Sequence, residues 1–141
     1  MVPVNNKTLS CYLDCPAEIT HKTAGRKVYP ITFNAIRLME LGEATIVPIL
    51  NPITELLKPE IEKLIQLASP VTNRNVELIE YIGTTGFRYK YKTQNIGTWA
   101  GFFTIDCCNP KQFIYLLSLK IDVFGWIPAG FAHNAQTFLI V

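Results

Sequence analysis

The chain has 141 residues, with 13 Lys and Arg against 11 Asp and Glu and a formal net charge of +2. Hydrophobic residues make up 49% and charged residues 17% of the sequence, which excludes intrinsic disorder because disordered chains have the opposite balance. So small a net charge is not by itself the signature of a nucleic-acid-binding domain. The length predicts a single domain, residues 1–141, around one core.

The small number of charges also bears on partners and location. Too few charged side chains are available to cover the surface, which predicts a homo-oligomer or a protein partner. Residues 113–132 form the most apolar stretch but contain Lys120, Asp122 and Pro128, so we expect no membrane-spanning helix. The start, MVPVNNKTLS, lacks the apolar core of a secretory signal, which predicts a cytoplasmic protein whose four cysteines are free thiols.

The first elements along the chain are expected to be extended. TLSCYLD, residues 8–14, combines β-branched and aromatic residues and predicts a short strand. The polar segment that follows, through Arg26, predicts a loop. VYPITF, residues 28–33, is expected to be extended again, with Pro30 confined to a strand edge or end because it lacks an N–H.

Helix signals come next. Asn34 is the expected N-cap of a helix that Gly42 ends in a left-handed cap. ATIVPIL, residues 44–50, is a β-branched run typical of a strand buried on both faces. Asn51-Pro52 then predicts the start of a helix over about 52–68, because Asn caps a free N–H and Pro has none to lose. That helix is expected to be interrupted at Pro59 and to restart there.

The second half predicts a meander. NVELIEYI, FRYKYKT and GTWAGFFTIDC are expected to be successive strands (residues 75–82, 87–93 and 97–107). The Gly83–Gly86 link is short enough to close a hairpin between the first pair. Asn109-Pro110 predicts a second helix start, for an apolar helix over about 110–120. KIDVFGWIPAG and QTFLIV at the C-terminus are expected to be strands.

These elements predict an α+β fold with a mainly antiparallel sheet and the helices at about 52–68 and 110–120 packed on it. IVPILNPITELL and TIDCCNPKQFIYLL both run from a strand through Asn-Pro into a helix. Two such units around a hairpin suit an α+β sandwich, with a ferredoxin-like arrangement with added strands as one option.

The stretch GFRYKYKT alternates rings and positive charges. In a strand, Phe87, Tyr89 and Tyr91 would share one face and the other face would carry three cations, Arg88, Lys90 and Lys92. We favour an aromatic face against the core and a solvated or edge-protecting basic face. The alternatives are contact with another protein and an anionic partner such as nucleic acid, bound with the help of a second basic cluster, Lys22, Arg26 and Lys27.

The cysteines do not form a metal-binding pattern. In an extended segment the sulfurs of Cys11 and Cys15 would be about 13 Å apart, and adjacent residues such as Cys107 and Cys108 point to opposite faces. His21 and His133 are the only histidines that could add ligands. We therefore expect no metal site and favour buried, inert cysteines.

Cys108 is a candidate nucleophile because it precedes Asn109-Pro110 and would lie beside the positive end of a helix, where the pKa of a thiol falls. His133 and Asn134 could complete a Cys-His-Asn set. The competing interpretation is a small apolar side chain packed at a strand-to-helix turn.

No other catalytic pattern stands out. Glu77 and Glu80 are close in the sequence, but in a regular strand they would fall on opposite faces, so we expect no assembled carboxylate pair there. Gly83 and Gly86 lack both the spacing and the lysine of a phosphate-binding loop, and no cofactor is expected.

The favoured function is a small non-enzymatic cytosolic interaction or regulatory module. We expect it to self-associate through apolar surface around the C-terminal strand and the 110–120 helix. The alternatives are a nucleic-acid-binding module that uses the basic strand face and a cysteine-dependent enzyme centred on Cys108.

Overall fold

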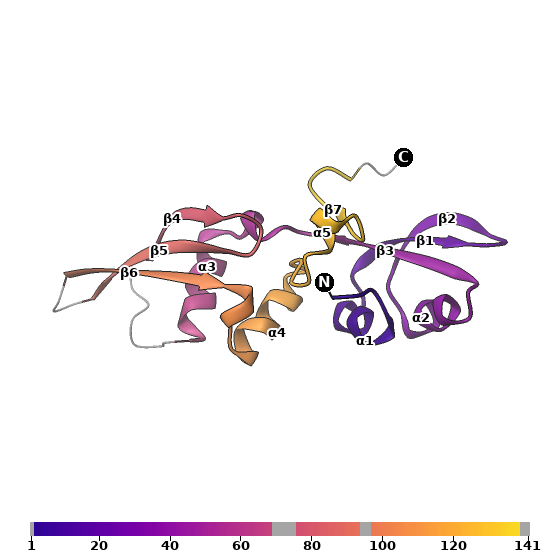
Figure 1. The fold of residues 1–141 in the computed structure, drawn as a ribbon, viewed down its shortest axis with the longest axis horizontal. Coiled ribbons are helices and arrows are strands. Elements are labelled where there is room, and N and C mark those ends of the chain that lie inside the picture. The colour runs from indigo at the N-terminus through magenta and orange to yellow at the C-terminus, as the bar shows by residue number, and fades with distance from the viewer. Residues whose placement is uncertain (1, 69–75, 94–96, 139–141) are drawn as a thin grey trace. The chain divides into compact units, whose positions relative to one another are not determined.

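The computed structural model describes residues 2–68, 76–93 and 97–138 (Figure 1). Two compact units make up the chain: Met1–Asn51 with Phe124–Val141, called unit 1, and Pro52–Val123, called unit 2. Helices accompany two mainly antiparallel sheets, so the α+β prediction is confirmed. The prediction of one domain concerns independent folding and stays a prediction. Among the described residues, no helix is both long and apolar enough to cross a membrane.

The sheet of unit 1 has the strand order β2-β1-β3-β7. Its strands are β1, β2, β3 and β7 (Pro16–His21, Gly25–Pro30, Ala44–Leu50 and His133–Asn134). β1 pairs antiparallel with β2 and β3, and β7 runs parallel to β3. The loop predicted through Arg26 is wrong, because buried Ala17 and Ile19 alternate with the more exposed Glu18 and Thr20 in a regular strand.

The helices of unit 1 correct two further predictions. Its α-helices are α1, α2 and α5 (Asn6–Leu9, Phe33–Glu40 and Trp126–Ala129). Instead of the strand predicted at residues 8–14, α1 and a 3-10 turn lie there. Asn5 and Thr8 form a capping box, in which each side chain accepts from the other's backbone N–H at 3.0 and 2.9 Å. The N-cap of α2 is Thr32 rather than Asn34, because its Oγ1 accepts from the N–H of Ala35.

The core of unit 1 joins both ends of the chain. Trp126 is fully buried, and its Nε1 donates to the carbonyl of Val2 at 2.8 Å. The ring of Tyr12, also fully buried, lies 5.7 Å from the ring of Trp126 and 5.9 Å from that of Phe124. The first of the two predicted C-terminal strands is therefore wrong, since its tryptophan lies in α5. The second, residues 136–141, is a turn through Thr137, and residues 139–141 lie outside the described residues.

Unit 2 contains the predicted meander, with strand order β4-β5-β6 and antiparallel pairing throughout. Its strands are β4 (Glu77–Ile82), β5 (Gly86–Thr93) and β6 (Gly97–Thr104). Its α-helices are α3 (Lys58–Gln66) and α4 (Pro110–Ser118). Figure 1 shows α3 beside this sheet. Buried Phe87 and Phe103 stack across β5 and β6, with ring centroids 5.3 Å apart.

The two Asn-Pro signals have different outcomes. At Asn51-Pro52 the predicted helix start is wrong: a 3-10 turn follows without a side-chain cap, and α3 begins only at Lys58. The side chain that caps the start of α3 is Glu60, whose Oε1 accepts from the N–H of Leu57 at 2.8 Å. At Asn109-Pro110 the prediction is confirmed, since Asn109 is the N-cap of α4.

Asn109 and Gln112 also join α4 to the end of α3. Their side-chain oxygens form a reciprocal capping box, with Gln112 N donating to Asn109 Oδ1 at 2.8 Å and Asn109 N donating to Gln112 Oε1 at 3.0 Å. The amide nitrogens reach across to α3: Gln112 Nε2 donates to the carbonyl of Leu64 at 2.9 Å, and Asn109 Nδ2 to that of Leu67 at 3.2 Å. Two side chains thus satisfy backbone groups at both helix ends.

Candidate functional site

The basic face of β5 has the predicted alternation. Phe87 is fully buried, whereas Arg88 and Lys90 are exposed on the opposite face. The side chain of Lys92 lies outside the described residues. Two of the three predicted cations can therefore be placed, and their partners decide whether this face could attract an anion.

A β-bulge in β4 supplies those partners. The register shifts between Leu78 and Glu80, so that Glu77 lies opposite Lys90 and Glu80 lies opposite Arg88. Ile79 is the extra residue, and it puts both glutamates on the basic face of the sheet. The prediction that Glu77 and Glu80 fall on opposite faces is therefore wrong, since it assumed a regular strand.

The bulge turns the basic face into a set of ion pairs. Arg88 Nη1 lies 2.9 Å from Glu80 Oε1, and Lys90 Nζ lies 3.2 Å from Glu77 Oε2. About half of each of these side chains is exposed, so each pair contributes roughly 0–1 kcal/mol to stability. Their larger effect is to balance the charges that an anionic partner would have used.

The aromatic face of β5 packs within unit 2. Tyr89 lies across Gly101 of β6, where an added Cβ would be 2.7 Å from the Tyr89 Cζ atom. Burial raises the pKa of Tyr89, and the neighbouring Tyr91 adds to the rise. Because Gly101 has no side chain, it leaves room for the ring of Tyr89.

The outer edge of β6 differs from the other sheet edges. β6 pairs with β5 in unbroken register over eight residue pairs and contains no charged residue and no proline. In the part of the chain that the structure describes, no strand pairs with its other side. The remaining edges carry devices that hinder strand association: β4 has the bulge and its glutamates, β2 has Arg26, Lys27 and Pro30, and β7 has only two residues.

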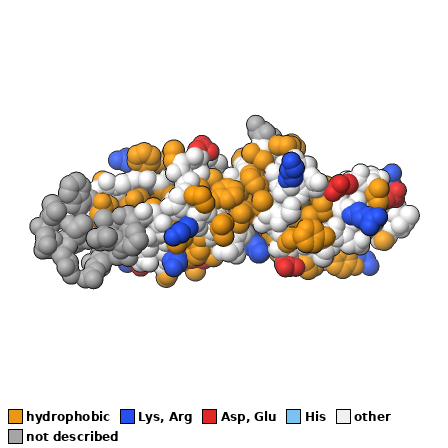
Figure 2. Space-filling model, turned by 90° about the horizontal axis from the view of Figure 1, so that it is seen from below, with side chains coloured by type: hydrophobic (Ala, Val, Ile, Leu, Met, Phe, Trp, Pro, Cys, Tyr) orange, Lys and Arg blue, Asp and Glu red, His pale blue; other side chains and the backbone are white. Residues whose placement is uncertain are grey.

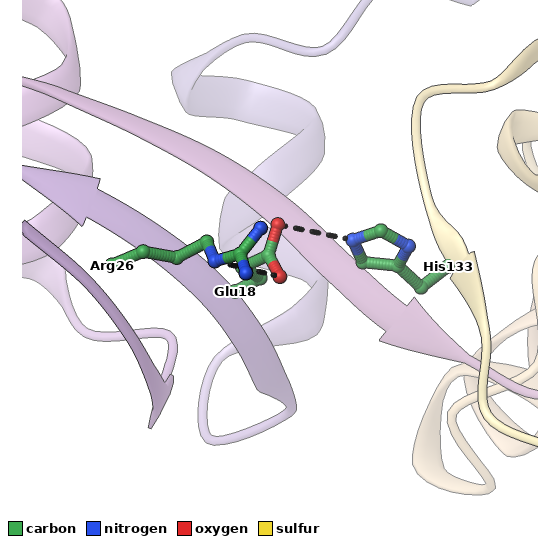
Figure 3. Close-up of polar contacts among 3 residues, drawn as sticks. All are labelled: Glu18, Arg26 and His133. Atoms are coloured by element: carbon green, nitrogen blue, oxygen red, sulfur yellow. Dashed lines mark hydrogen bonds and ion pairs between the residues drawn. The ribbon is translucent and has the colours of Figure 1, made fainter. Parts of the chain in front are cut away.

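A polar cluster in unit 1 is centred on Glu18 (Figure 3). The Glu18 side chain is 17% exposed; its Oε1 lies 3.3 Å from His133 Nε2, and its Oε2 lies 3.7 Å from Arg26 Nε. Arg26 and His133 were predicted for separate sites, and Glu18 was not predicted at all. A carboxylate with each oxygen facing a cationic or hydrogen-bonding group is suited to hold β7 and β2 to β1.

The placement of Cys108 does not favour an activated thiol. Burial is the largest influence and raises the pKa of Cys108; Asp106 and Cys107 add to the rise, while a backbone hydrogen bond lowers it. This direction is opposite to the one expected from the helix end. Cys108 belongs to unit 2, whereas His133 and Asn134 belong to unit 1. The proposed catalytic set stays a prediction without support from this pKa.

The other cysteines show no ligand cluster. All four cysteines are free thiols. Cys15 is buried and donates from Sγ to the carbonyl of Ile49 at 3.3 Å, whereas Cys11 and Cys107 are exposed, so the prediction of buried cysteines is wrong for those two. Within residues 2–68, 76–93 and 97–138, no group of three or more His, Cys, Asp or Glu could hold a metal ion.

Comparison with family models, curated proteins and solved structures found no match to this chain.

Proposed function

We propose that the chain is a small non-enzymatic cytosolic interaction module that self-associates through the outer edge of β6. The observation that carries this proposal is that β6 is paired in unbroken register over eight residue pairs and contains no charged residue. A strand edge presents unpaired N–H and C=O groups, which a second strand can satisfy. Two copies related by a two-fold axis would pair their β6 strands antiparallel and join their meanders into one sheet.

Exposed side chains on β6 support the same contact. Phe102 is 68% exposed, and Thr98 and Ala100, which share its face, are exposed as well. In an antiparallel pair, residues opposite each other share a face, so Phe102 would lie against these small side chains of the second copy. Burying most of one phenylalanine contributes about 1–2 kcal/mol, and the symmetric contact occurs twice.

The surface expected from the sequence was a different one. Exposed Ile114 on α4, with 65% of its surface accessible, is apolar area of the predicted kind, but the end of the C-terminal strand lies outside the described residues. Figure 2 shows hydrophobic side chains interspersed with Lys and Arg on the face that it presents. We prefer β6 because it also offers backbone hydrogen bonds, which give an association its direction and register.

The nucleic-acid alternative has no specific support. Two of its three principal cations, Arg88 and Lys90, already face glutamates at ion-pair distance. Phosphate binding at this face would have to compete with both pairs.

The test measures the mass of the chain by sedimentation over a range of concentrations. Wild-type protein is expected to reach twice the 15.9 kDa monomer mass. Phe102→Lys is expected to raise the dissociation constant of the dimer by about tenfold or more, because each copy loses an apolar contact and gains a charge at the pairing edge.

The matched control is Phe33→Lys on α2 of unit 1, since Phe33 is 70% exposed, much like Phe102. The same chemical change at the same exposure is expected to leave the dimer intact. Ala100→Lys tests the edge independently of the phenylalanine. A monomeric wild type at high concentration, or a Phe102→Lys protein that associates as wild type does, would refute the proposal.

A further inference from the structure

The edge strand β2 in unit 1 has the opposite chemistry to β6. Basic residues surround the β1–β2 hairpin: His21 and Lys22 where β1 ends, and Arg26 and Lys27 where β2 begins. β2 is the outermost strand of its sheet, and five of its six residues are exposed. The second basic cluster predicted from the sequence is thus brought together on an accessible sheet edge.

A groove of about 250 Å³ lies beside this edge. Ile19, His21 and Tyr29 line it from the strands, and Asn34, Ala35 and Leu38 line it from α2. The β1–β2 register pairs Ile19 with Lys27, which places the lysine on the face of the sheet that borders the groove. The groove therefore combines an aromatic wall, apolar side chains and a cation at its border, and no acidic residue lines it.

The cations of the hairpin are largely uncompensated. Arg26 faces Glu18 across 3.7 Å on the opposite face of the sheet. Neither Lys22 nor Lys27 forms an ion pair with a carboxylate in the described part of the chain. Lysine at a sheet edge hinders pairing with another neutral or basic strand, and this repulsion becomes attraction for an acidic one.

We propose that β2 and its groove bind an extended acidic segment of another protein as an added strand. The backbone edge of Gly25–Tyr29 pairs with the segment, and Pro30 ends the ladder because it has no N–H. Acidic side chains of the segment lie beside Lys27 and Arg26, and an apolar side chain enters the groove against Tyr29, which is 43% exposed.

The arrangement of the charges favours a peptide over a nucleic acid. Arg26 and Lys27 are adjacent in β2, so their side chains project from opposite faces of the sheet. The two side chains therefore lie on either face of an added strand, where its alternating side chains can reach both. They do not form a continuous row of positive charge on one face, which a phosphate backbone would need. A polypeptide also uses the N–H and C=O groups of the edge, which nucleic acid leaves unpaired.

The test uses a fluorescein-labelled peptide of alternating Glu and Val, with a Lys and Val peptide and a single-stranded oligothymidylate as comparisons. Anisotropy titrations are expected to show binding of the acidic peptide that weakens as salt is added. Lys27→Glu is expected to weaken it about tenfold at low salt, because an attraction becomes a repulsion. The matched control, Lys63→Glu on the exposed side of α3, is expected to bind as wild type does.

Backbone amide shifts locate the contact. NMR spectra are expected to show changes at residues 25–29 of β2 on adding the acidic peptide. Equal binding of the Lys and Val peptide, displacement of the acidic peptide by oligothymidylate, or unchanged affinity in Lys27→Glu would overturn the proposal. The titration is repeated with Phe102→Lys protein, where binding is expected to persist, so that failure at β2 and failure of self-association at β6 are separate results.

Discussion

Replacing Gln112 by Met tests the connection between α3 and α4 most directly. Methionine keeps the length and helix propensity of glutamine but can form neither of its two hydrogen bonds. Gln112 is only 5% exposed, and its Nε2 donor is bonded to the carbonyl of Leu64 at 2.9 Å. The substitution therefore leaves a carbonyl at the end of α3 without that partner and removes half of the capping box of α4.

The expected magnitude follows from these two losses. An unsatisfied buried carbonyl costs about 1–3 kcal/mol, and loss of a helix cap costs about 1 kcal/mol. Methionine recovers part of this through apolar contact, so we expect Gln112→Met to lower the free energy of unfolding of unit 2 by about 2 kcal/mol.

The assay is urea unfolding followed by circular dichroism, together with hydrogen exchange of the α3 and α4 amides. Hydrogen exchange assigns the loss to unit 2 even if the two units unfold separately. Gln66→Met is the matched control, because Gln66 on α3 is half-buried and no side-chain hydrogen bond of Gln66 is observed among the described residues.

Two results would contradict a stabilising role for Gln112. A loss below about 0.5 kcal/mol, or an equal loss in Gln66→Met, would show that the connection contributes little. Asn109→Ala provides a second check: because Asn109 and Gln112 bond to each other, the double variant is expected to lose less stability than the sum of the two single variants.

Three further substitutions and one chemical reaction test other features of unit 2. Gly86→Ala is expected to destabilise unit 2 by about 3 kcal/mol or more in thermal unfolding, because its Cβ would collide with a backbone carbonyl of β6; Gly101→Ala is expected to cost less, since the colliding group is the movable ring end of Tyr89. The opposite order would contradict this account. Arg88→Ala is expected to change the urea midpoint by less than the equivalent of about 1 kcal/mol, with a smaller change in high salt, because the pair is half exposed; a larger, salt-independent loss would speak against it. Cys108 is expected to react with iodoacetamide at neutral pH more slowly than an unperturbed thiol, since its pKa is raised and the thiolate is scarce; faster alkylation would restore the thiol-enzyme hypothesis.

The parts of the fold that the sequence predicts correctly depend on local signals. Alternation in GFRYKYKT and the glycine-bounded link before it define the hairpin of β4 and β5, and Asn109-Pro110 defines the start of α4. Each of these signals is complete within a few residues. At residues 8–14 two local signals conflict. The β-branched and aromatic composition favours a strand, whereas the capping box of Asn5 and Thr8 favours a helix, and the structure has the helix.

The candidate sites depend on contacts between residues that are far apart in the sequence. Glu18 and His133 are 115 positions apart, and nothing near Glu18 indicates that an imidazole will lie 3.3 Å from its carboxylate. The pairing of Glu77 and Glu80 with the cations of β5 depends on the shift in register, which is a property of two strands together. Sequence reasoning identified the cations themselves but could not assign their partners.

The bulge at Ile79 makes β4 unusually tolerant of the deletion of one residue. Removing one residue from a strand normally turns every later side chain to the other face of the sheet. Here the register already pairs Leu78 with Tyr89 and Glu80 with Arg88, the partners that a regular strand without Ile79 would have. A chain shortened by that single residue is expected to keep both ion pairs, so this strand offers evolution and protein engineering a position where a deletion preserves the pattern of the surface.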